Sequence, residues 1–375
     1  KHFVGDGATD GGIEGGNATM TDQVMRETYL PPYAAAVDKG IASIMVGFNS
    51  YNGINLHQHT HLVTDILKGE LGFKGVVVSD WNGGIRFGEP HTVINAGVDI
   101  AMQPGNHDEF MSKLKASVLD KTVPMSRIDD AVNRILAMKF KLGLFSDPFG
   151  KEEFATSIGS DKHRAIARQA VRESVVLLKN ENAALPLLPT ESIAVVGEHG
   201  NNSGLQSGGW SIQWQGQAES YRGATTIFDG MNAIGSNVEY AEQGCYPGMA
   251  ADKAVVVVGE NPYAEGFGDT ENLRLTKAHK NLISGCKNLN KQVIVMLISG
   301  RVLLIKDELA DSDAFVAAWL PGSEGAGVAD FLFATDGFKP VGQSPYAWPV
   351  NYADIPLAQD AEHALFTFGY GLQDY

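Results

Sequence analysis

A single carboxylate stands at the end of a short apolar run in the first quarter of the chain. Asp80 follows Gly75–Ser79, whose three valines are typical of a buried strand. Barrel and open-sheet enzymes place reactive groups at such positions, because the ends of parallel strands converge there. The alternative is that Asp80 caps the next helix. Trp81 favours the reactive role, since an indole beside a carboxylate is suited to lie against the apolar face of a sugar ring.

A second strand-like run opens into a loop that holds three carboxylates. Val255–Gly259 is followed by Glu260, Glu265 and Asp269. A solvated acidic loop is the alternative interpretation. The proline, tyrosine, phenylalanine and glycines between these acids indicate a shaped loop instead, and functional residues are often carried on such loops. All three acids are therefore candidates for a functional carboxylate.

Two further patterns raise the possibility of a metal or a nucleotide, and neither is complete. His57, His59 and His61 alternate as in some zinc sites, but no second cluster of His or Cys completes a ligand set. The glycines of Gly197–Gly204 follow a strand-like run, yet their spacing is not G-x-G-x-x-G, and G-K-[ST] occurs nowhere in the chain. We expect neither a bound metal nor a cofactor.

The elements that must position these carboxylates alternate between strand-like and helix-like patterns. In the first part, apolar runs such as Ile41–Phe48 and Gly75–Trp81 lie between amphipathic stretches, which predicts part of a barrel or an open α/β sheet. A polar stretch around Leu144–Ser157 follows, and then a predicted helix over Asp161–Leu178. A second alternation begins at Ser192–Gly197 and predicts an α/β sandwich with a mainly parallel sheet.

Length and composition limit the class of protein. The 375 residues, 44% of them hydrophobic, are enough for two cores, and we expect a first domain at 1–150, a linker at 151–160 and a second domain at 161–375. The net charge of −15 disfavours nucleic acid and anionic membrane surfaces as partners. No apolar run reaches the roughly 18 residues of a membrane-spanning helix. Cys245 and Cys286 allow a single disulfide, which leaves the redox compartment open.

Five segments share residue patterns with one enzyme family: Lys1–Gly7, Ser43–Asn49, Val78–Trp81, Gly208–Gly216 and Gly259–Glu265. Together they resemble family 3 glycoside hydrolases of the β-glucosidase and exo-β-glucanase branch, and the resemblance runs from the first residue to nearly the last. The first resembles the Lys-His segment that holds glucose hydroxyls, and the second resembles the barrel strand that follows it. The third, Val78–Trp81, resembles the nucleophile motif. The fourth resembles the tryptophan-bearing loop of the exo-glucanase type, and the fifth resembles the acid/base loop.

The resemblance implies a role for individual residues. It places Asp80 on the nucleophile and Glu265 on the acid/base. The substrate-binding residues that it implies are Lys1, His2, Met45, Phe48, Trp81, Arg86 and Trp214. It also implies that residues 1–150 are the C-terminal part of a (β/α)8 TIM-type barrel and that residues 161–375 are an α/β sandwich that carries the acid/base. We therefore expect the active site at the domain interface, with neither domain active alone.

The activity implied is that of a retaining, exo-acting β-glucosidase or β-glucan glucohydrolase, which releases glucose from the non-reducing ends of β-glucans or oligosaccharides. In such enzymes one carboxylate forms a covalent glycosyl-enzyme, while the other protonates the leaving oxygen and later activates water. A β-xylosidase or a β-N-acetylglucosaminidase of the same family is an alternative, and so is a non-catalytic carbohydrate-binding protein. The N-acetylglucosaminidases typically carry an Asp-His pair on a barrel loop, whereas Asp6–Asp10 offers no histidine. A secreted or periplasmic location is expected.

The start of the chain departs from the family pattern. Only about 150 residues precede the predicted linker, so we expect the first strands of the barrel to be absent from this chain. The missing part is expected to hold an aspartate and an arginine of the sugar pocket. The chain begins at Lys1 with neither an initiator Met nor a signal-peptide pattern, and we expect that a segment has been removed upstream.

Overall fold

The computed structural model describes residues 1–289 and 291–375. These residues form two compact units, Lys1–Lys151 and Glu152–Tyr375. Each unit has a hydrophobic core of its own. In the described part of the chain, no helix combines the length and the apolar character that crossing a membrane requires.

Four parallel segments form the centre of the first unit. β2 (Ser43–Met45) pairs with β5 (Val76–Val78). Phe3 bridges to Val46 just beyond β2, and Ile100 bridges to the last residue of β5, so the pairing extends on both sides. Helices separate the successive segments along the chain, which is the arrangement of a (β/α) barrel. The predicted TIM-type barrel portion is confirmed.

The other helices and strands of this unit surround the four segments. In chain order they are β1 (Asn17–Ala18), α1 (Asp22–Val24), a π-helix at Met25–Tyr29, α2 (Pro31–Asp38), β3 (Ser50–Tyr51), β4 (Ile54–Asn55), a π-helix at His61–Glu70, α3 (Pro90–Ala96), α4 (His107–Leu119) and α5 (Met125–Lys141). The second π-helix buries Leu62 and Ile66 in the same apolar cluster as Ile44 of β2 and Val77 of β5. This packing fixes the two strands against the helices that follow them.

A buried carboxylate braces β5 near its end. The Asp99 side chain is fully buried and accepts hydrogen bonds from Lys68 Nζ at 2.7 Å and from the Val77 N–H at 2.9 Å. It also pairs with the guanidinium of Arg127. Since a buried charge is tolerated only when it is paired and hydrogen-bonded, this group locks the strand that leads to Asp80.

A six-stranded sheet forms the centre of the second unit. The strand order is β6-β11-β10-β9-β7-β8, and neighbouring strands run parallel except for β6, which is antiparallel to β11. The strands are β6 (Val176–Asn180), β7 (Ser192–Val196), β8 (Asn237–Ala241), β9 (Lys253–Gly259), β10 (Gln292–Ile298) and β11 (Ala314–Trp319). The predicted mainly parallel sheet is confirmed.

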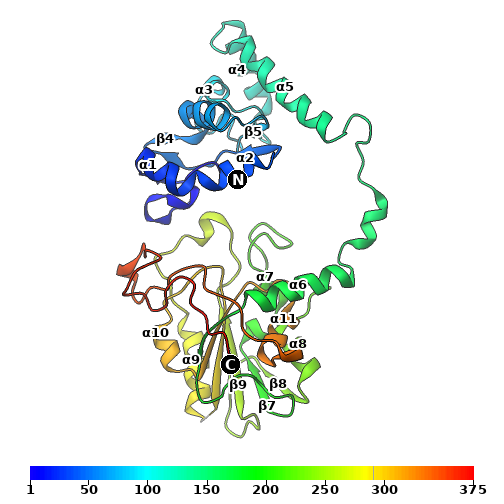
Figure 1. Cartoon of the computed structure of the whole chain (residues 1–375), viewed down its shortest axis with the longest axis vertical. Coiled ribbons are helices and arrows are strands. Elements are labelled where there is room, and N and C mark those ends of the chain that lie inside the picture. The colour runs from blue at the N-terminus through cyan, green and yellow to red at the C-terminus, as the bar shows by residue number, and fades with distance from the viewer. Residues whose placement is uncertain (290) are drawn as a thin grey trace. The chain divides into compact units, whose positions relative to one another are not determined.

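Helices cover both faces of this sheet (Figure 1). They are α6 (Asp161–Ser174), α7 (Ser203–Ser207), α8 (Ile227–Ile234), α9 (Lys277–Asn288), α10 (Lys306–Ala310) and α11 (Gly325–Leu332). Side chains alternate along a strand, so Val255 and Val257 of β9 pack with α8 and α11, while Val256 and Val258 pack with α9 on the other face. The predicted α/β sandwich is confirmed.

Short 3-10 turns connect these elements in both units, at Asp6–Ala8, Asp10–Gly12, Leu56–Gln58, Glu152–Ser157, Glu198–Asn201, Glu265–Gly268, Thr335–Gly337 and Tyr352–Asp354. One disulfide, Cys245 to Cys286, joins the segment after β8 to α9. The sequence alone left the state of these two cysteines open.

The predicted helix over Asp161–Leu178 is too long. Helix α6 ends at Ser174, and Val176–Asn180 forms strand β6. The apolar run at this point is buried by pairing with β11, so tertiary pairing overrides the helical pattern that continues from α6.

Candidate active site

Asp80 lies two residues beyond β5, and its surroundings hold it in one orientation. Its N–H donates to His57 Nε2 at 2.9 Å, and its Oδ1 accepts from the Trp81 N–H at 2.6 Å. The Ser79 hydroxyl donates to the Asp80 carbonyl oxygen at 2.8 Å. The second carboxylate oxygen, Oδ2, lies 3.6 Å from His2 Nε2, and the side chain is 16% exposed. The result is an oriented carboxylate that solvent or a substrate can reach.

The helix-capping alternative for Asp80 is wrong. The next helix is α3, which begins at Pro90 and has Glu89 at its N-cap position. The Asp80 carboxylate instead accepts the N–H of its own neighbour, Trp81. Its position at the strand end is therefore free for another role.

His57 supports the backbone of Asp80, and sequence reasoning considered it only as a zinc ligand. Its Nδ1 lies 3.0 Å from Asn55 Oδ1, so Nδ1 carries the proton and Nε2 accepts the Asp80 N–H. Burial, and then the charge of Arg86, lower the pKa of His57 to about 4. The ring is therefore neutral at pH 7. Gly83 allows this approach, because a Cβ at that position would lie 2.4 Å from His57 Nε2.

Other predicted residues of the first unit lie around the same strand end. The Arg86 guanidinium lies over the Phe48 ring, 4.2 Å from its centroid. Phe87, which sequence reasoning missed, stacks on His57 with ring centroids 4.8 Å apart. Met45 pairs with the last residue of β5. Phe48, Arg86 and Phe87 therefore place aromatic rings and one cation near the strand end that leads to Asp80.

Lys1 and His2 line a pocket of about 510 Å³ together with Asp6 and Tyr33. His2 is held from two sides, since its Nδ1 lies 3.1 Å from Asp6 Oδ2 and its carbonyl oxygen accepts the Tyr33 hydroxyl. The Nε2 atom then faces Asp80. The structure therefore joins His2, Asp6 and Asp80 in one polar group.

In the second unit, Glu260 and Glu265 stand on the same loop in different surroundings. Glu260 Oε1 accepts from Arg301 Nε at 3.0 Å and Nη2 at 2.7 Å. Its Oε2 accepts from the Ser299 hydroxyl at 2.6 Å and the Tyr263 hydroxyl at 3.1 Å. The Glu260 side chain is 19% exposed. Four hydrogen bonds hold this carboxylate, which makes it an anchor between β9 and β10.

Glu265 is exposed at the start of a 3-10 turn, and its backbone has φ 55°. A left-handed conformation costs a residue with a Cβ on the order of 1 kcal/mol, and such strain is concentrated at functional sites. The Ala264 N–H donates to Gln215 Oε1 at 2.9 Å, which ties this loop to the loop at Gly208–Gly216. Sequence reasoning did not identify Gln215.

Three exposed aromatic side chains gather beside Glu265, and we name them the aromatic cluster: Trp210, Trp214 and Phe267. Trp214 meets Phe267 edge to face, with ring centroids 5.7 Å apart, and the Trp210 ring lies tilted to Trp214 with centroids 6.4 Å apart. Their exposed fractions are 65%, 47% and 72% in chain order. Exposed aromatic groups of this kind mark binding surfaces. Phe267 follows Glu265 by two residues, and this closeness in sequence was the available signal.

The three alternating histidines have separate partners. His59 is buried and its Nδ1 accepts the Leu62 N–H at 3.3 Å, whereas His61 is exposed and pairs with Asp65 at 3.1 Å. Among residues 1–289 and 291–375, the potential metal ligands that come together are Glu198, His199 and His279 in the second unit.

Two family models match this chain. The Glycosyl hydrolase family 3 C-terminal domain matches residues 175–374, and the Glycosyl hydrolase family 3 N terminal domain matches residues 1–138. The chain belongs to glycoside hydrolase family 3. The family predicted from the five sequence segments is confirmed.

Two solved family 3 structures are similar over 99% of this chain. An exo-1,3/1,4-beta-glucanase from a Pseudoalteromonas species is 40% identical with a TM-score of 0.94, and the match covers 50% of that chain. A beta-glucosidase from Listeria innocua in complex with glucose is 27% identical with a TM-score of 0.89, and the match covers 57% of that chain.

Curated relatives of this family 3 chain carry two kinds of name. A periplasmic beta-glucosidase of Salmonella typhimurium is 30% identical over 99% of this chain and 57% of its own length. A beta-xylosidase of Formosa agariphila is 30% identical over 99% of this chain and 58% of its own length. The chain therefore spans a little over half the length of these relatives.

Proposed function

We propose that this family 3 chain carries the catalytic pair of a retaining, exo-acting β-glucosidase or β-glucan glucohydrolase. Its substrates are β-glucans or β-linked gluco-oligosaccharides, and its product is glucose. The observation that carries the proposal is the setting of Asp80, an oriented and accessible carboxylate at a barrel-strand end. The names of the glucanase and β-glucosidase relatives support glucose as the sugar.

The chemistry divides between two carboxylates. Asp80 Oδ2 attacks the anomeric carbon and forms a glycosyl ester, while Glu265 gives its proton to the leaving oxygen. Glu265 then takes a proton from water, which attacks the ester and releases glucose with the original configuration. In retaining enzymes the two carboxylates stand about 5–5.5 Å apart, and the proposal requires this separation of Asp80 and Glu265.

Residues around the pair have positioning roles in this proposal. His57 is neutral and accepts the Asp80 N–H, so it fixes the backbone of the nucleophile without a competing charge. His2, held by Asp6, faces the attacking oxygen. Lys1, Met45, Phe48 and Arg86 are proposed to bind the sugar.

Glu265, and not Glu260, is assigned as the acid/base because their surroundings differ. Glu260 already accepts four hydrogen bonds, two of them from Arg301, so protein groups occupy both of its carboxylate oxygens. Glu265 is exposed and lies beside the aromatic cluster. It can therefore exchange protons with a substrate and with water.

Trp214 is proposed to bind the leaving-side sugar together with Trp81. Both indoles are exposed, at 47% and 56%, and a flat aromatic face grips a pyranose ring while specifying its linkage loosely. Trp214→Ala in the full-length natural protein should lower kcat/KM for a β-linked gluco-oligosaccharide by ~10-fold or more, and for an aryl glucoside with a good leaving group only slightly.

Tyr352→Ala is the matched control for this variant, because Tyr352 is 46% exposed and stands outside the aromatic cluster. It should leave both substrates unaffected. If Trp214→Ala damages the aryl glucoside as much as the oligosaccharide, Trp214 has no leaving-side role.

A panel of aryl β-glycosides tests the proposed activity. The full-length natural protein should hydrolyse the β-glucoside at least ~10-fold better than the β-xyloside, because a glucose pocket leaves buried polar groups unpaired when the hydroxymethyl group is missing. The name of the Formosa relative makes β-xyloside hydrolysis the second candidate. A preference for the xyloside or the N-acetylglucosaminide would replace the assignment, and sugar binding without hydrolysis would indicate a carbohydrate-binding protein.

A secreted or periplasmic location is proposed on two grounds. The disulfide between Cys245 and Cys286 is of the kind that persists in oxidising compartments. The Salmonella relative is named a periplasmic enzyme.

A further inference from the structure

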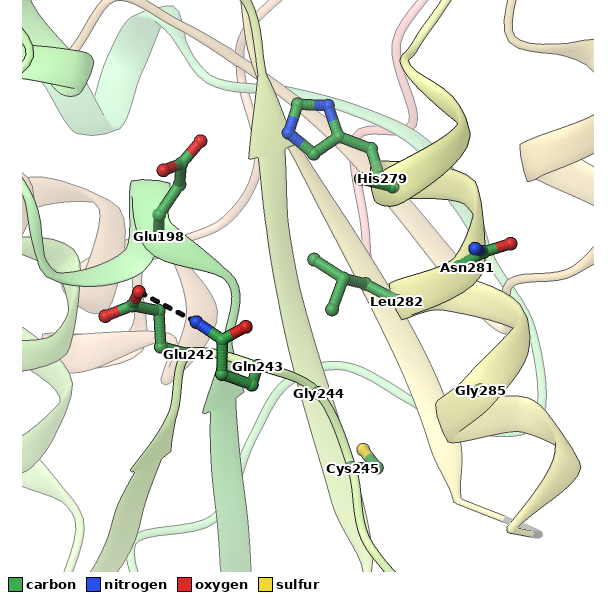
Figure 2. Close-up of a pocket in the computed structure, with 10 residues that line it drawn as sticks. Glu198, Glu242, Gln243, Gly244, Cys245, His279, Asn281, Leu282 and Gly285 are labelled. Atoms are coloured by element: carbon green, nitrogen blue, oxygen red, sulfur yellow. Dashed lines mark hydrogen bonds between the residues drawn. The ribbon is translucent and has the colours of Figure 1, made fainter.

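Glu198, His199 and His279 come together in the second unit, and Glu198 and His279 also line a pocket there. Glu198 and His199 open the 3-10 turn that follows β7, and His279 lies in the first turn of α9. One potential ligand atom from each side chain lies within 4.8 Å of the other two. Figure 2 shows Glu198 and His279 at the same end of this pocket of about 440 Å³, with Leu282 and Cys245 further along.

Both histidines are buried and each has a ring nitrogen that the described residues leave unsatisfied. His199 is 0% exposed and His279 is 9% exposed. His199 Nε2 lies 3.2 Å from the Glu260 carbonyl oxygen, so it carries the proton and Nδ1 is a bare acceptor. Within the part of the chain that the structure describes, neither this Nδ1 nor that of His279 has a hydrogen-bond partner. A buried polar atom left unpaired destabilises the folded state, so two in adjacent rings call for an explanation.

The arrangement of the two buried rings favours a cation at this place. The two rings stand nearly perpendicular with centroids 5.5 Å apart. Glu198 adds a carboxylate on the exposed side of the pair.

We propose that Glu198, His199 and His279 form a Zn²⁺ site whose remaining position is taken by water. Two imidazoles and one carboxylate are a ligand set that suits zinc, and Mg²⁺ prefers oxygen ligands. In a tetrahedral site with bonds of 2.0–2.1 Å, ligand atoms stand ~3.4 Å apart. The ligand atoms lie within 4.8 Å of one another, so zinc binding requires the side chains to close by up to about 1.4 Å.

The proposed zinc site is joined to the loop that carries Glu265. Metal bound to His199 Nδ1 fixes the tautomer in which Nε2–H donates to the Glu260 carbonyl oxygen. Glu260 is the residue where β9 passes into the loop, and its side chain is held by Arg301. Zinc therefore braces the base of this loop. This consequence rests on the proposed function, whereas the metal site itself does not.

Zinc binding by the full-length natural protein tests the proposal directly. After treatment with a chelator and dialysis, calorimetric titration with ZnCl₂ should show one site per chain with micromolar or tighter affinity. Because the metal binds the folded state, zinc at 100 times Kd should raise the ratio of folded to unfolded protein about 100-fold, and the Tm should rise with it. MgCl₂ at the same concentration should leave the Tm unchanged.

A pair of isosteric variants separates this site from binding elsewhere. Glu198 is exposed, so Glu198→Gln should fold normally and weaken zinc binding at least ~10-fold. Glu242 lines the same pocket outside the three-residue group, and Glu242→Gln should bind zinc within about twofold of the parent. Absence of zinc binding in the parent overturns the proposal, and so does equal affinity in the two variants. Neither readout requires hydrolysis, so failure of the proposed function would not alter them.

Discussion

Asp80→Asn in the full-length natural protein is expected to lower kcat/KM for an aryl β-glucoside by at least ~10⁴-fold, or ~5.5 kcal/mol of transition-state stabilisation. Asparagine keeps the shape of the side chain and the acceptor for the Trp81 N–H. An amide cannot form the glycosyl ester, so the first step has no nucleophile. The measurement is steady-state kinetics, accompanied by thermal unfolding to show that the fold is intact.

Asp6→Asn is the matched control, because Asp6 touches the other nitrogen of the same histidine, His2, at 3.1 Å. Asparagine keeps an acceptor for His2 but removes the charge, and because a hydrogen bond to a charged group is worth about 1.5–3 kcal/mol, kcat/KM should fall by ~10–100-fold at most. The contrast between the two variants separates the nucleophile from a positioning residue. Equal losses would contradict the assignment of Asp80.

The effect of Glu265→Ala on the rate of hydrolysis is expected to depend on the leaving group of the substrate. Hydrolysis of an unactivated β-glucoside should fall by about 10²–10⁴-fold, because a general acid contributes that much. A dinitrophenyl glucoside needs no protonation, so its glycosylation rate should change little. Added azide should replace the base-activated water in the second step and yield a β-glycosyl azide.

Two neighbouring glutamates provide the controls for this variant. Glu271 is exposed, and Glu271→Ala should retain activity on every substrate. Glu260→Ala should break the contacts with Arg301, Ser299 and Tyr263 and lower stability, without rescue by azide. If azide rescues Glu260→Ala and not Glu265→Ala, the acid/base is Glu260.

Local patterns in the sequence were enough to predict the elements that carry the two proposed carboxylates. The valines before Asp80 and before Glu260 are continuous because both strands are buried on both faces, and such runs predict strands without knowledge of their partners. Since reactive side chains stand at strand ends, its position made Asp80 a candidate, and Trp81 favoured the reactive role over helix capping. The roles of Asp80 and Glu265 stay predictions until they are tested.

Contacts between distant segments could not be predicted in the same way. Asp80 and His57 are 23 residues apart, and Glu260 and Arg301 are 41 residues apart, so no local pattern joins them. The boundary between α6 and β6 was missed because the buried pairing with β11 determines it. His199 and His279 are likewise 80 residues apart in the chain, and the fold brings the turn after β7 close to the first turn of α9.

Covalent trapping with a slow 2-fluoro-β-glucoside tests directly whether Asp80 is the nucleophile of a retaining glycosidase. The fluorine slows both steps, and an activated leaving group keeps the first step faster than the second, so the glycosyl ester accumulates. Mass spectrometry of the digested full-length natural protein should find one labelled peptide, with the sugar on Asp80. A label on another carboxylate, such as Asp6 or Glu260, or steady turnover with inverted product and no label, would contradict the account.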